Sequence, residues 1–195
     1  AFAFRGDTVE RMETVTPQDF AEIYAEMGYG EALYRDTNSL SYVVEPSEGL
    51  WLLGLDACLY RENTMDGHPV TDGEFLPGTL EWIEEIYREA IIQQKTLMAF
   101  MHHGVLEHYK GQERFFGEYV VNNHKTVSQR FAQMGIKVVF TGHYHSQDIT
   151  LKKWNDYEFL FDVETGSLVT WPCPVREVSI QGDSMFIRSS YITSI

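Results

Sequence analysis

Two apolar runs that each end directly in histidines constrain the fold of this chain most strongly. Residues 96–101 (TLMAFM) lead into HHG at residues 102–104, and residues 136–140 (IKVVF) lead into TGHYH at residues 141–145. A helix is predicted between the two runs, over about residues 125–134, where a glycine ends it. Strand, helix and strand in this order are typical of parallel, buried strands joined by a helical crossover. The pattern therefore predicts parallel neighbouring strands in an α/β domain.

Two further helices are predicted before the first apolar run. One begins at Thr16-Pro17, because proline is favoured in the first turn of a helix. The other follows Thr79, which is a good N-cap residue, and its apolar residues line one face. The first helix is expected to bury a stripe of apolar side chains, comprising Phe20, Ile23, Tyr24 and Met27.

Short apolar segments predict strands towards both ends of the chain. Residues 41–44 and 50–55 flank the turn-forming sequence EPSEG and are expected to form a hairpin. After residue 145 the pattern changes to short alternating strands with glycine-containing turns, which is typical of antiparallel pairing. These strands are predicted at residues 158–161, 175–180 and 185–191. No Ser/Gly-rich or Pro-rich linker divides the chain, so residues 1–195 are expected to form a single domain.

The distribution of histidines is the strongest chemical signal in the sequence. Six of the seven histidines lie between His102 and His145. The carboxyl ends of parallel strands meet at one rim of a sheet, so both groups of histidines are expected to lie close together. In extended backbone His143 and His145 would face the same side, about 6.6 Å apart at the backbone. They could bind one metal ion or one ion each, and hydrogen-bonded surface histidines are the alternative interpretation.

Composition limits the classes of partner. The 15 Lys and Arg residues against 29 Asp and Glu give a formal charge of −14, which repels phosphate backbones, so nucleic acid is not expected as the main partner. No apolar run reaches the about 18 residues that a membrane span requires. Cys58 and Cys173 show no Cys-x-x-Cys pairing, so neither a thiolate zinc site nor a disulfide framework is indicated. The start AFAFRGDTVE, without Met, is expected to mark a processed or truncated chain.

The order of apolar strand, HHG, helix, apolar strand and TGHYH resembles the second half of the calcineurin-like metallophosphoesterases. His102 matches the lone histidine that follows a strand in that family, and His143 and His145 match its closing G-H-x-H motif. The resemblance implies an α/β fold that is part of a metallophosphoesterase-type β-sandwich flanked by helices, with antiparallel strands at the C-terminal end. It also implies that these histidines help to bind two divalent metal ions, of which Mn, Fe, Ni and Zn suit imidazole with carboxylate.

Earlier motifs of the family are missing upstream of His102, namely D-x-H, G-D after a strand, and G-N-H-D or G-N-H-E. The sequence GD at residues 6–7 does not follow an apolar strand, and NNH at residues 122–124 is expected to be a loop or a helix cap. The chain is therefore expected to be a fragment that lacks the N-terminal half of the domain. Alone it is expected to bind metal weakly or not at all, to be inactive, and to form dimers through apolar surface exposed by the truncation.

Three other residues near the apolar runs are candidates for supporting roles. His103 and His108 could contact substrate oxygen atoms, and supporting a ligand or facing solvent is the alternative for both. Asp56, at the end of the run LLGLDA, is expected to hydrogen-bond a loop. No catalytic proton donor or nucleophile is identified.

The resemblance implies a phosphoesterase in which a metal-activated water hydrolyses a small phosphate mono- or diester. A non-catalytic module on the same fold, binding a protein or a glycan, is the first alternative. A mononuclear zinc hydrolase with three histidine ligands is the second, but an evident general base is missing beside them. Residues 164–177 (ETGSLVTWPCPVRE) resemble a stretch of extracytoplasmic bacterial members, so such a location is expected. The substrate is not predicted, because one fold serves many substrates with the same metals.

Overall fold

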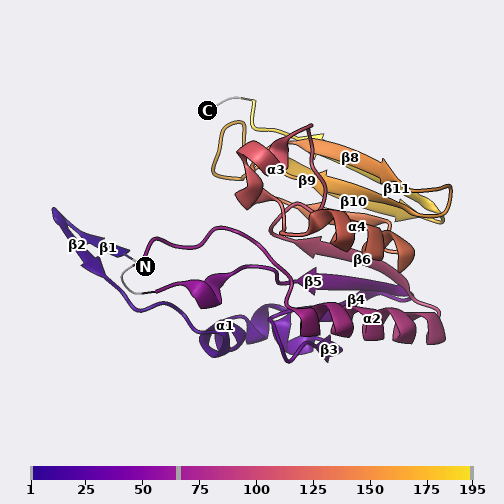
Figure 1. Cartoon of the computed structure of the whole chain (residues 1–195), viewed down its shortest axis with the longest axis horizontal. Helices are drawn as coiled ribbons and strands as arrows, with labels where there is room; N and C mark the ends of the chain where they lie inside the picture. The colour runs from indigo at the N-terminus through magenta and orange to yellow at the C-terminus, as the bar shows by residue number, and fades with distance from the viewer. Residues whose placement is uncertain (1, 65–66, 194–195) are drawn as a thin grey trace.

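A mixed β-sheet forms the centre of the structure, a computed structural model that describes residues 2–64 and 67–193. Within these residues it has seven strands: β3 (Tyr34–Arg35), β4 (Tyr42–Ser47), β5 (Leu50–Leu55), β6 (Thr96–Met101), β7 (Val138–Thr141), β8 (Asp148–Lys153) and β9 (Phe159–Glu164). Their order in space is β3-β4-β5-β6-β7-β9-β8. The strands β5, β6, β7 and β9 run parallel, whereas β3, β4 and β8 pair antiparallel with their neighbours. Figure 1 shows this parallel centre with its antiparallel edges.

The strands β5 and β6 are continuous apolar runs because neighbouring strands and a layer of helices keep water away from them. Trp51, Leu53 and Ala99 are buried. Ala99 of β6 lies opposite Val139 of β7 in a parallel register. The predicted parallel pairing of the two strands that precede the histidines is therefore confirmed. The hairpin predicted before the first helical crossover is also confirmed, as β4 and β5.

Two long helices, α2 (Pro77–Ile92) and α4 (His124–Gln133), cover the sheet. Ile83 of α2 and Phe131 of α4 are buried in one hydrophobic core together with residues of β5 and β6. The helices also contact each other, since Arg130 of α4 forms an ion pair with Glu84 of α2. They therefore lie side by side on one face of the sheet, as in Figure 1. α4 confirms the helix predicted between the two histidine groups.

The helix α2 begins before the predicted cap residue. Leu76 occupies the N-cap position and Pro77 the first helical position, so the expectation of Thr79 as N-cap is wrong. Thr79 is instead buried, and its Oγ1 donates a 2.6 Å hydrogen bond to Asp36. The hydroxyl group that suggested a cap thus connects the helix to the loop before β4.

The N-terminal part of the chain departs from the sequence expectation. Thr16 caps α1 (Pro17–Ile23) through a capping box with Asp19, so the predicted start is correct. The predicted buried stripe is wrong, because Phe20 is 37% exposed and Met27 is 72% exposed. α1 ends after about two turns, and its Phe20 packs against the aromatic rings of Tyr24 and Tyr29. Figure 1 shows the hairpin of β1 (Phe2–Arg5) and β2 (Thr8–Arg11) projecting beyond α1.

The C-terminal strands confirm the predicted antiparallel end. β8 and β9 pair antiparallel at the sheet edge, and β10 (Val175–Gln181) and β11 (Ser184–Ser190) form a separate two-stranded sheet. Arg176 of β10 attaches this second sheet, because its Nη2 donates hydrogen bonds to the backbone oxygens of Asp148 and Glu164. The α/β class with antiparallel C-terminal strands is thus confirmed, and the second sheet comprises two strands of the described residues.

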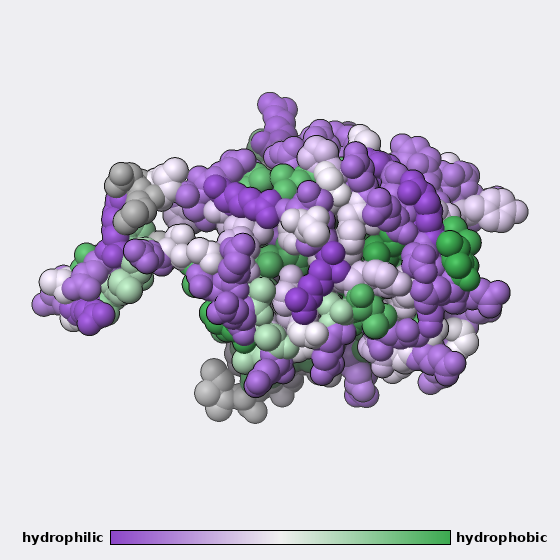
Figure 2. Space-filling view, turned by 90° about the horizontal axis from the view of Figure 1, so that it is seen from below, coloured by the Kyte–Doolittle hydropathy of each residue, from purple (hydrophilic) through white to green (hydrophobic). Residues whose placement is uncertain are grey.

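The remaining helices are short, namely α3 (Gln112–Phe115) and the 3-10 helices η1 (Ala25–Met27), η2 (Tyr29–Glu31), η3 (Tyr60–Glu62) and η4 (Gly117–Tyr119). None of the helices in the described residues combines the length and the apolar character that crossing a membrane requires. The face seen in Figure 2 is predominantly hydrophilic, with hydrophobic residues scattered between hydrophilic ones. The expected dimer stays a prediction.

Candidate metal centre

Histidines that follow β6 and β7 meet at one edge of the sheet. The Nε2 atom of His102 lies 3.0 Å from Nδ1 of His143, and the two rings are 4.4 Å apart between centroids. The segments are also joined by their backbones, because Gly142 donates its N–H to the carbonyl oxygen of His102 at 3.0 Å. The parallel register of β6 and β7 places both residues at the same level. His102 and His143 therefore form a pair, called the histidine pair below.

The third histidine of the expected set is not part of this pair. His145 is exposed, and its side chain forms no hydrogen bond within the described residues. Its charge nevertheless acts on the pair, since it lowers the pKa of both His102 and His143. In the part of the chain that the structure describes, these three histidines do not bring one ligand atom each within 4.8 Å of one another. The structure thus brings two of the three residues together.

The backbone after β7 explains this arrangement. His143 and His145 have φ angles of 69° and 61°, so both adopt the left-handed conformation. The expectation of extended backbone, with both side chains on one side, is wrong because β7 ends at Thr141 and the chain turns at once. Tyr144 donates its N–H to the oxygen of Gly142 at 2.9 Å within this turn. Left-handed backbone at residues other than glycine costs about 1–3 kcal/mol and is concentrated at functional sites.

The buried ring of His103 packs against both rings of the histidine pair. It is 2% exposed, and its ring packs edge-on against His102 and His143 at centroid distances of 5.2 and 4.7 Å. The carbonyl oxygen of Thr71 accepts hydrogen bonds from Nε2 of His103 at 2.8 Å and from Nε2 of His143 at 3.2 Å. Of the two interpretations of His103, these contacts favour support of a ligand over contact with substrate.

The bond to Thr71 also fixes which nitrogen of His143 is available. A carbonyl oxygen only accepts, so Nε2 of His143 carries the proton, and Nδ1 of the neutral ring keeps a lone pair that accepts the hydrogen bond from Nε2 of His102. Burial lowers the pKa of His102 and His143, and the charges of neighbouring histidines lower it further. Both rings are therefore neutral near pH 7, which is the form that binds metal ions.

Gly73 gives His103 the space that it occupies. A Cβ atom at Gly73 would lie 2.7 Å from both Cγ and Nδ1 of His103, closer than carbon atoms approach each other without strain. Asn122 donates its backbone N–H to the oxygen of Gly73 at 2.7 Å. This hydrogen bond holds residues 71–73, called the strap below, close to the ring of His103. The strap around Thr71 and Gly73 thus lies directly on the ring of His103.

His108 lies in a separate, buried cluster of charged groups. Its Nδ1 is 2.8 Å from Asp148, and its Nε2 lies 3.4 Å from Asp162 and 3.6 Å from Glu164. Burial alone would lower the pKa of His108, but its hydrogen bonds and the charges of these carboxylates outweigh burial and raise the pKa to about 9. His108 is therefore protonated at neutral pH and faces carboxylates with both ring nitrogens. This placement does not favour the substrate contact considered for it.

The carboxylates of this cluster hold the loops that carry the histidine pair. Asp162 is fully buried and accepts backbone N–H groups from Val105 and Leu106, which follow the HHG sequence. Its other oxygen accepts the hydroxyl group of Thr141, immediately before the TGHYH turn. Glu164, two residues further along β9, accepts the N–H of Ser146 at 3.2 Å. One strand thus fixes both histidine loops.

The sequence contained a signal for these carboxylates that was missed. Asp162 and Glu164 end an apolar strand, as the histidines follow β6 and β7, and β9 is the next parallel strand of the sheet. The predicted strand ends at Phe161, so neither residue is predicted at this rim. Extending it by three residues would have placed both carboxylates on one face at the same rim.

Aromatic residues of the loop before α4 cover the other side of the pair. The ring of Tyr119 lies 4.7 Å from that of His143 and 5.0 Å from that of Tyr144. Phe116 packs edge-on against Tyr144 at 5.7 Å, and Tyr109 approaches it through a hydroxyl contact of 3.2 Å. These rings form an aromatic wall beside the histidine pair.

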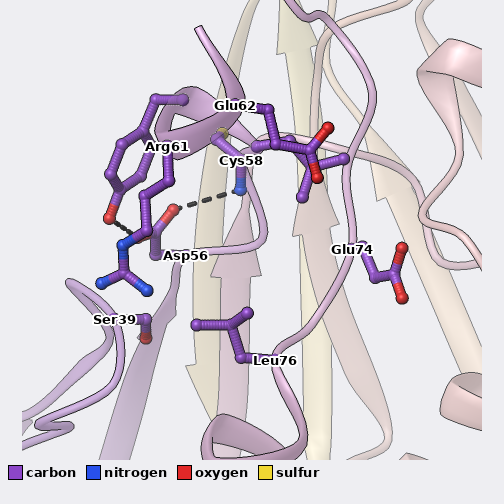
Figure 3. Close-up of a pocket in the computed structure, with 9 residues that line it drawn as sticks. Ser39, Asp56, Cys58, Arg61, Glu62, Glu74 and Leu76 are labelled. Atoms are coloured by element: carbon purple, nitrogen blue, oxygen red, sulfur yellow. Dashed lines mark hydrogen bonds between the residues drawn. The ribbon is translucent and has the colours of Figure 1, made fainter.

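Asp56 serves the loop role expected for it. Its carboxylate accepts hydrogen bonds from the N–H groups of Leu40 and Cys58 and from the hydroxyl group of Tyr60. Figure 3 shows it lining a pocket of about 80 Å³ beside Cys58, whose Sγ lies 4.0 Å from Nδ1 of His103. Ligand sites usually have volumes of about 300–1,000 Å³. This pocket is therefore too small for a substrate.

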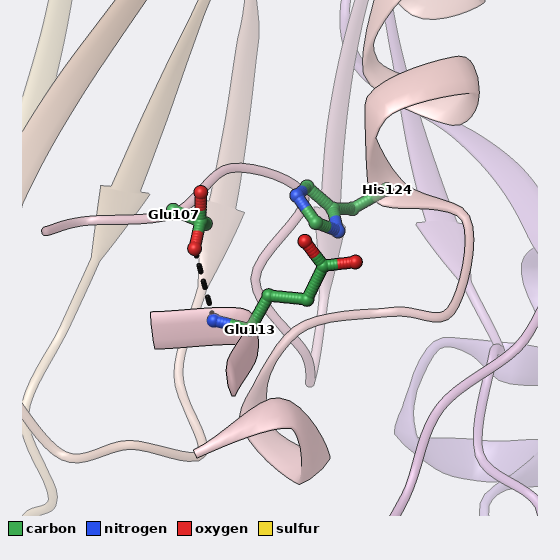
Figure 4. Close-up of side chains that lie close together, drawn as sticks. All are labelled: Glu107, Glu113 and His124. Atoms are coloured by element: carbon green, nitrogen blue, oxygen red, sulfur yellow. Dashed lines mark hydrogen bonds between the residues drawn. The ribbon is translucent and has the colours of Figure 1, made fainter. Parts of the chain in front are cut away.

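A second group with metal-binding chemistry lies in the segment between β6 and α4. One ligand atom each of Glu107, Glu113 and His124 lies within 4.8 Å of the other two. Figure 4 shows both carboxylates beside the imidazole. Asn123 takes the N-cap position of α4, as expected, but its side chain forms no cap hydrogen bond. No motif in the sequence connects His124 with the two glutamates.

Comparison with known proteins supports the fold. No family model and no curated protein matches the chain. A solved structure, described as a dimetal phosphatase from Danio rerio, is similar with a TM-score of 0.58 and 14% sequence identity. The similarity covers 79% of this chain and 58% of that chain, so this chain matches less than two thirds of that protein's length. At this identity the similarity shows a shared fold and no more.

Proposed function

We propose that the protein containing this chain is a metal-dependent phosphoesterase in which His102, His143 and His145 bind divalent metal ions. The observation that carries the proposal is the 3.0 Å approach of His102 Nε2 to His143 Nδ1 at the carboxyl ends of two parallel strands. The fold shared with a dimetal phosphatase supports the same function. The proposed substrate is a small phosphate mono- or diester.

The donor set of the histidine pair suits a transition metal. Both rings are neutral near pH 7 because their pKa is lowered, and neutral imidazole together with carboxylate suits Mn, Fe, Ni or Zn. Two such ions, when bound, would polarise the phosphoryl oxygens and lower the pKa of the attacking water. The histidines of this chain would bind these ions and fix their position.

Three neighbouring groups orient the proposed metal ligands His102 and His143. The carbonyl oxygen of Thr71 fixes the proton of His143 on Nε2, which leaves Nδ1 for a metal ion. His103 supports both rings by packing, and its own Nε2 is bound to the same oxygen. Tyr119 lies against His143 and limits access of water from its side.

His145 is the proposed third ligand. Its side chain is exposed and free of hydrogen bonds among the described residues, so a change of rotamer towards the pair breaks no hydrogen bond. Its effect on the pKa of His102 and His143 supports a position close to them. The left-handed backbone at His145 is consistent with a residue whose position matters to function.

We further propose that the chain is inactive by itself. Within the described residues, no carboxylate forms a hydrogen bond or ion pair with His102, His143 or His145. Two cations held within about 4 Å repel each other unless an anionic ligand lies between them. The same observation favours the alternative function, a module that keeps the fold and binds a partner without catalysis.

An activity assay separates these functions. The chain, and any longer gene product that includes it, are assayed on an aryl phosphate monoester and diester with Mn²⁺, Ni²⁺ or Zn²⁺. We expect turnover by the longer protein, none by the chain, and a loss of about 10²–10³ in the longer protein on His143→Gln. His68→Gln is the matched control, because His68 is an exposed histidine that is not among the proposed ligands. A longer protein that binds metal but lacks turnover would favour the binding module.

Two expectations from the sequence are kept as proposals. An extracytoplasmic bacterial location rests on the resemblance of residues 164–177. Dimer formation rests on exposed apolar side chains, including Phe4 at 77% and Met27 at 72% exposure. Size-exclusion chromatography of the chain with and without Met27→Lys tests the dimer directly.

A further inference from the structure

We propose that Glu107, Glu113 and His124 bind a divalent metal ion at a second site, which holds together the long segment between β6 and α4. The three residues are distinct from the histidine pair, and they lie in the loop after β6, in α3 and at the first position of α4. The inference does not depend on the proposed phosphoesterase activity.

The geometry fits one ion. A carboxylate oxygen of each glutamate and a ring nitrogen of His124 lie within 4.8 Å of one another. Ligands about 2.0–2.2 Å from a common tetrahedral ion lie about 3.3–3.6 Å apart, so each pair of ligand atoms must approach by at most about 1.5 Å when the ion binds. Figure 4 shows the carboxylate of Glu113 and the imidazole ring lying next to each other, with the Glu107 carboxylate near them.

The state of His124 is an independent indication of a ligand. The residue is only 4% exposed, yet its imidazole has no hydrogen-bond partner among the described residues. Most buried polar side chains have a hydrogen-bond partner, whereas this ring lies beside two carboxylates and forms a hydrogen bond with neither. Burial lowers the pKa of His124, which keeps the ring neutral and leaves a lone pair for a metal ion. A bound cation would satisfy this nitrogen.

The two glutamates are arranged to share a cation. Glu107 accepts the backbone N–H of Glu113 at 2.9 Å through one oxygen, which fixes its carboxylate and leaves the second oxygen available. Glu113 is paired with Lys125 at 2.5 Å. The side chain of Lys125 is 62% exposed, so it can move into solvent when a divalent ion replaces it. Lys125 is therefore a competitor of the metal ion at Glu113.

Such an ion would stabilise a segment that has little regular structure of its own. Between β6 and α4 the chain forms only α3, with four residues, and η4, with three, among the described residues. The segment carries Tyr119, whose ring lies against His143. A metal ion bound by its start, middle and end closes the loop and restricts its unfolded conformations. One nitrogen and two oxygen donors suit Zn²⁺ or Mn²⁺.

Calorimetric titration of the 195-residue chain with Zn²⁺ and Mn²⁺ tests the site. His143→Gln serves as the background, so that binding at the histidine pair does not obscure the result. We expect one ion to bind in this background, with affinity reduced at least tenfold by Glu113→Gln and increased by Lys125→Gln. Glu85→Gln is the matched control, because Glu85 is exposed on α2. The melting temperature should rise with metal in the background protein and not after Glu113→Gln.

The test remains decisive because the variant that removes a ligand is expected to fold. Glu113 is 52% exposed, so its substitution leaves the fold intact, and circular dichroism verifies this. Binding that is absent in the His143→Gln background, or equal with and without Glu113→Gln, would overturn the site. A decrease of affinity on Lys125→Gln would contradict the role of Lys125 as competitor, and with it the proposed use of the Glu113 carboxylate.

Discussion

The imidazole of His108 lies with Nε2 3.4 Å from a carboxylate oxygen of Asp162, and both side chains are almost completely buried. Asp162 belongs to β9, and His108 to the loop that follows the HHG sequence. The same carboxylate accepts backbone N–H groups of Val105 and Leu106. Charge and hydrogen bonding in the interior thus connect the sheet to the loop that presents His102.

The substitution Asp162→Asn tests this connection. It leaves His108 as a buried cation with one carboxylate fewer and replaces an acceptor by an amide group. Removing one partner of a buried ion pair costs about 3–5 kcal/mol. We therefore expect the free energy of unfolding, measured with urea, to fall by about 3 kcal/mol. Asp183→Asn, in the exposed turn between β10 and β11, should change it by less than about 0.5 kcal/mol.

The raised pKa of His108 predicts how stability depends on pH. The pKa is raised from 6.5 to about 9 in the folded protein, so folding favours the protonated ring. The stabilisation is fully present below about pH 6.5 and is lost as the pH rises through about 9. A difference of this size corresponds to about 3 kcal/mol.

Urea unfolding at pH 6 and at pH 10 measures this effect. The free energy of unfolding of the unchanged protein should decrease between the two pH values by more than that of the His108→Gln variant. Equal decreases in both proteins would show that His108 does not carry the pH dependence, and that its charge is not stabilised by Asp148, Asp162 and Glu164.

The parts of the fold that could be predicted from the sequence are the buried strands, because they form long apolar runs. β6 and β7 were predicted because strands buried on both sides have few polar residues, and the histidines mark where each strand reaches the rim. The apolar spacing from Phe20 to Met27 specifies a face but no partner for it, so the exposure of Met27 was not predictable. The turn at His143 depends on contacts with Thr71, which is distant in the sequence.

Gly73 provides a test of how closely the strap around Thr71 must approach His103. A methyl group introduced by Gly73→Ala would lie 2.7 Å from the ring, so the ring or the strap must move. We expect a loss of about 1–3 kcal/mol in the free energy of unfolding and weaker metal binding by the histidine pair. Gly117→Ala is the control, because a Cβ there meets no atom within 4 Å. An unchanged stability of Gly73→Ala would mean that the strap adjusts without cost.

The histidines should differ in their contributions to metal binding by this chain. His102 and His143 already face each other, so His102→Gln and His143→Gln each remove a placed ligand. His145 must first change its rotamer, so His145→Gln should weaken Zn²⁺ binding less than either of the other two substitutions. Losing a placed ligand should reduce affinity at least as much as losing a supporting partner, which costs about 10–100-fold. Calorimetry in the Glu113→Gln background isolates this site, and an equal or larger effect of His145→Gln would show that all three histidines converge before metal binds.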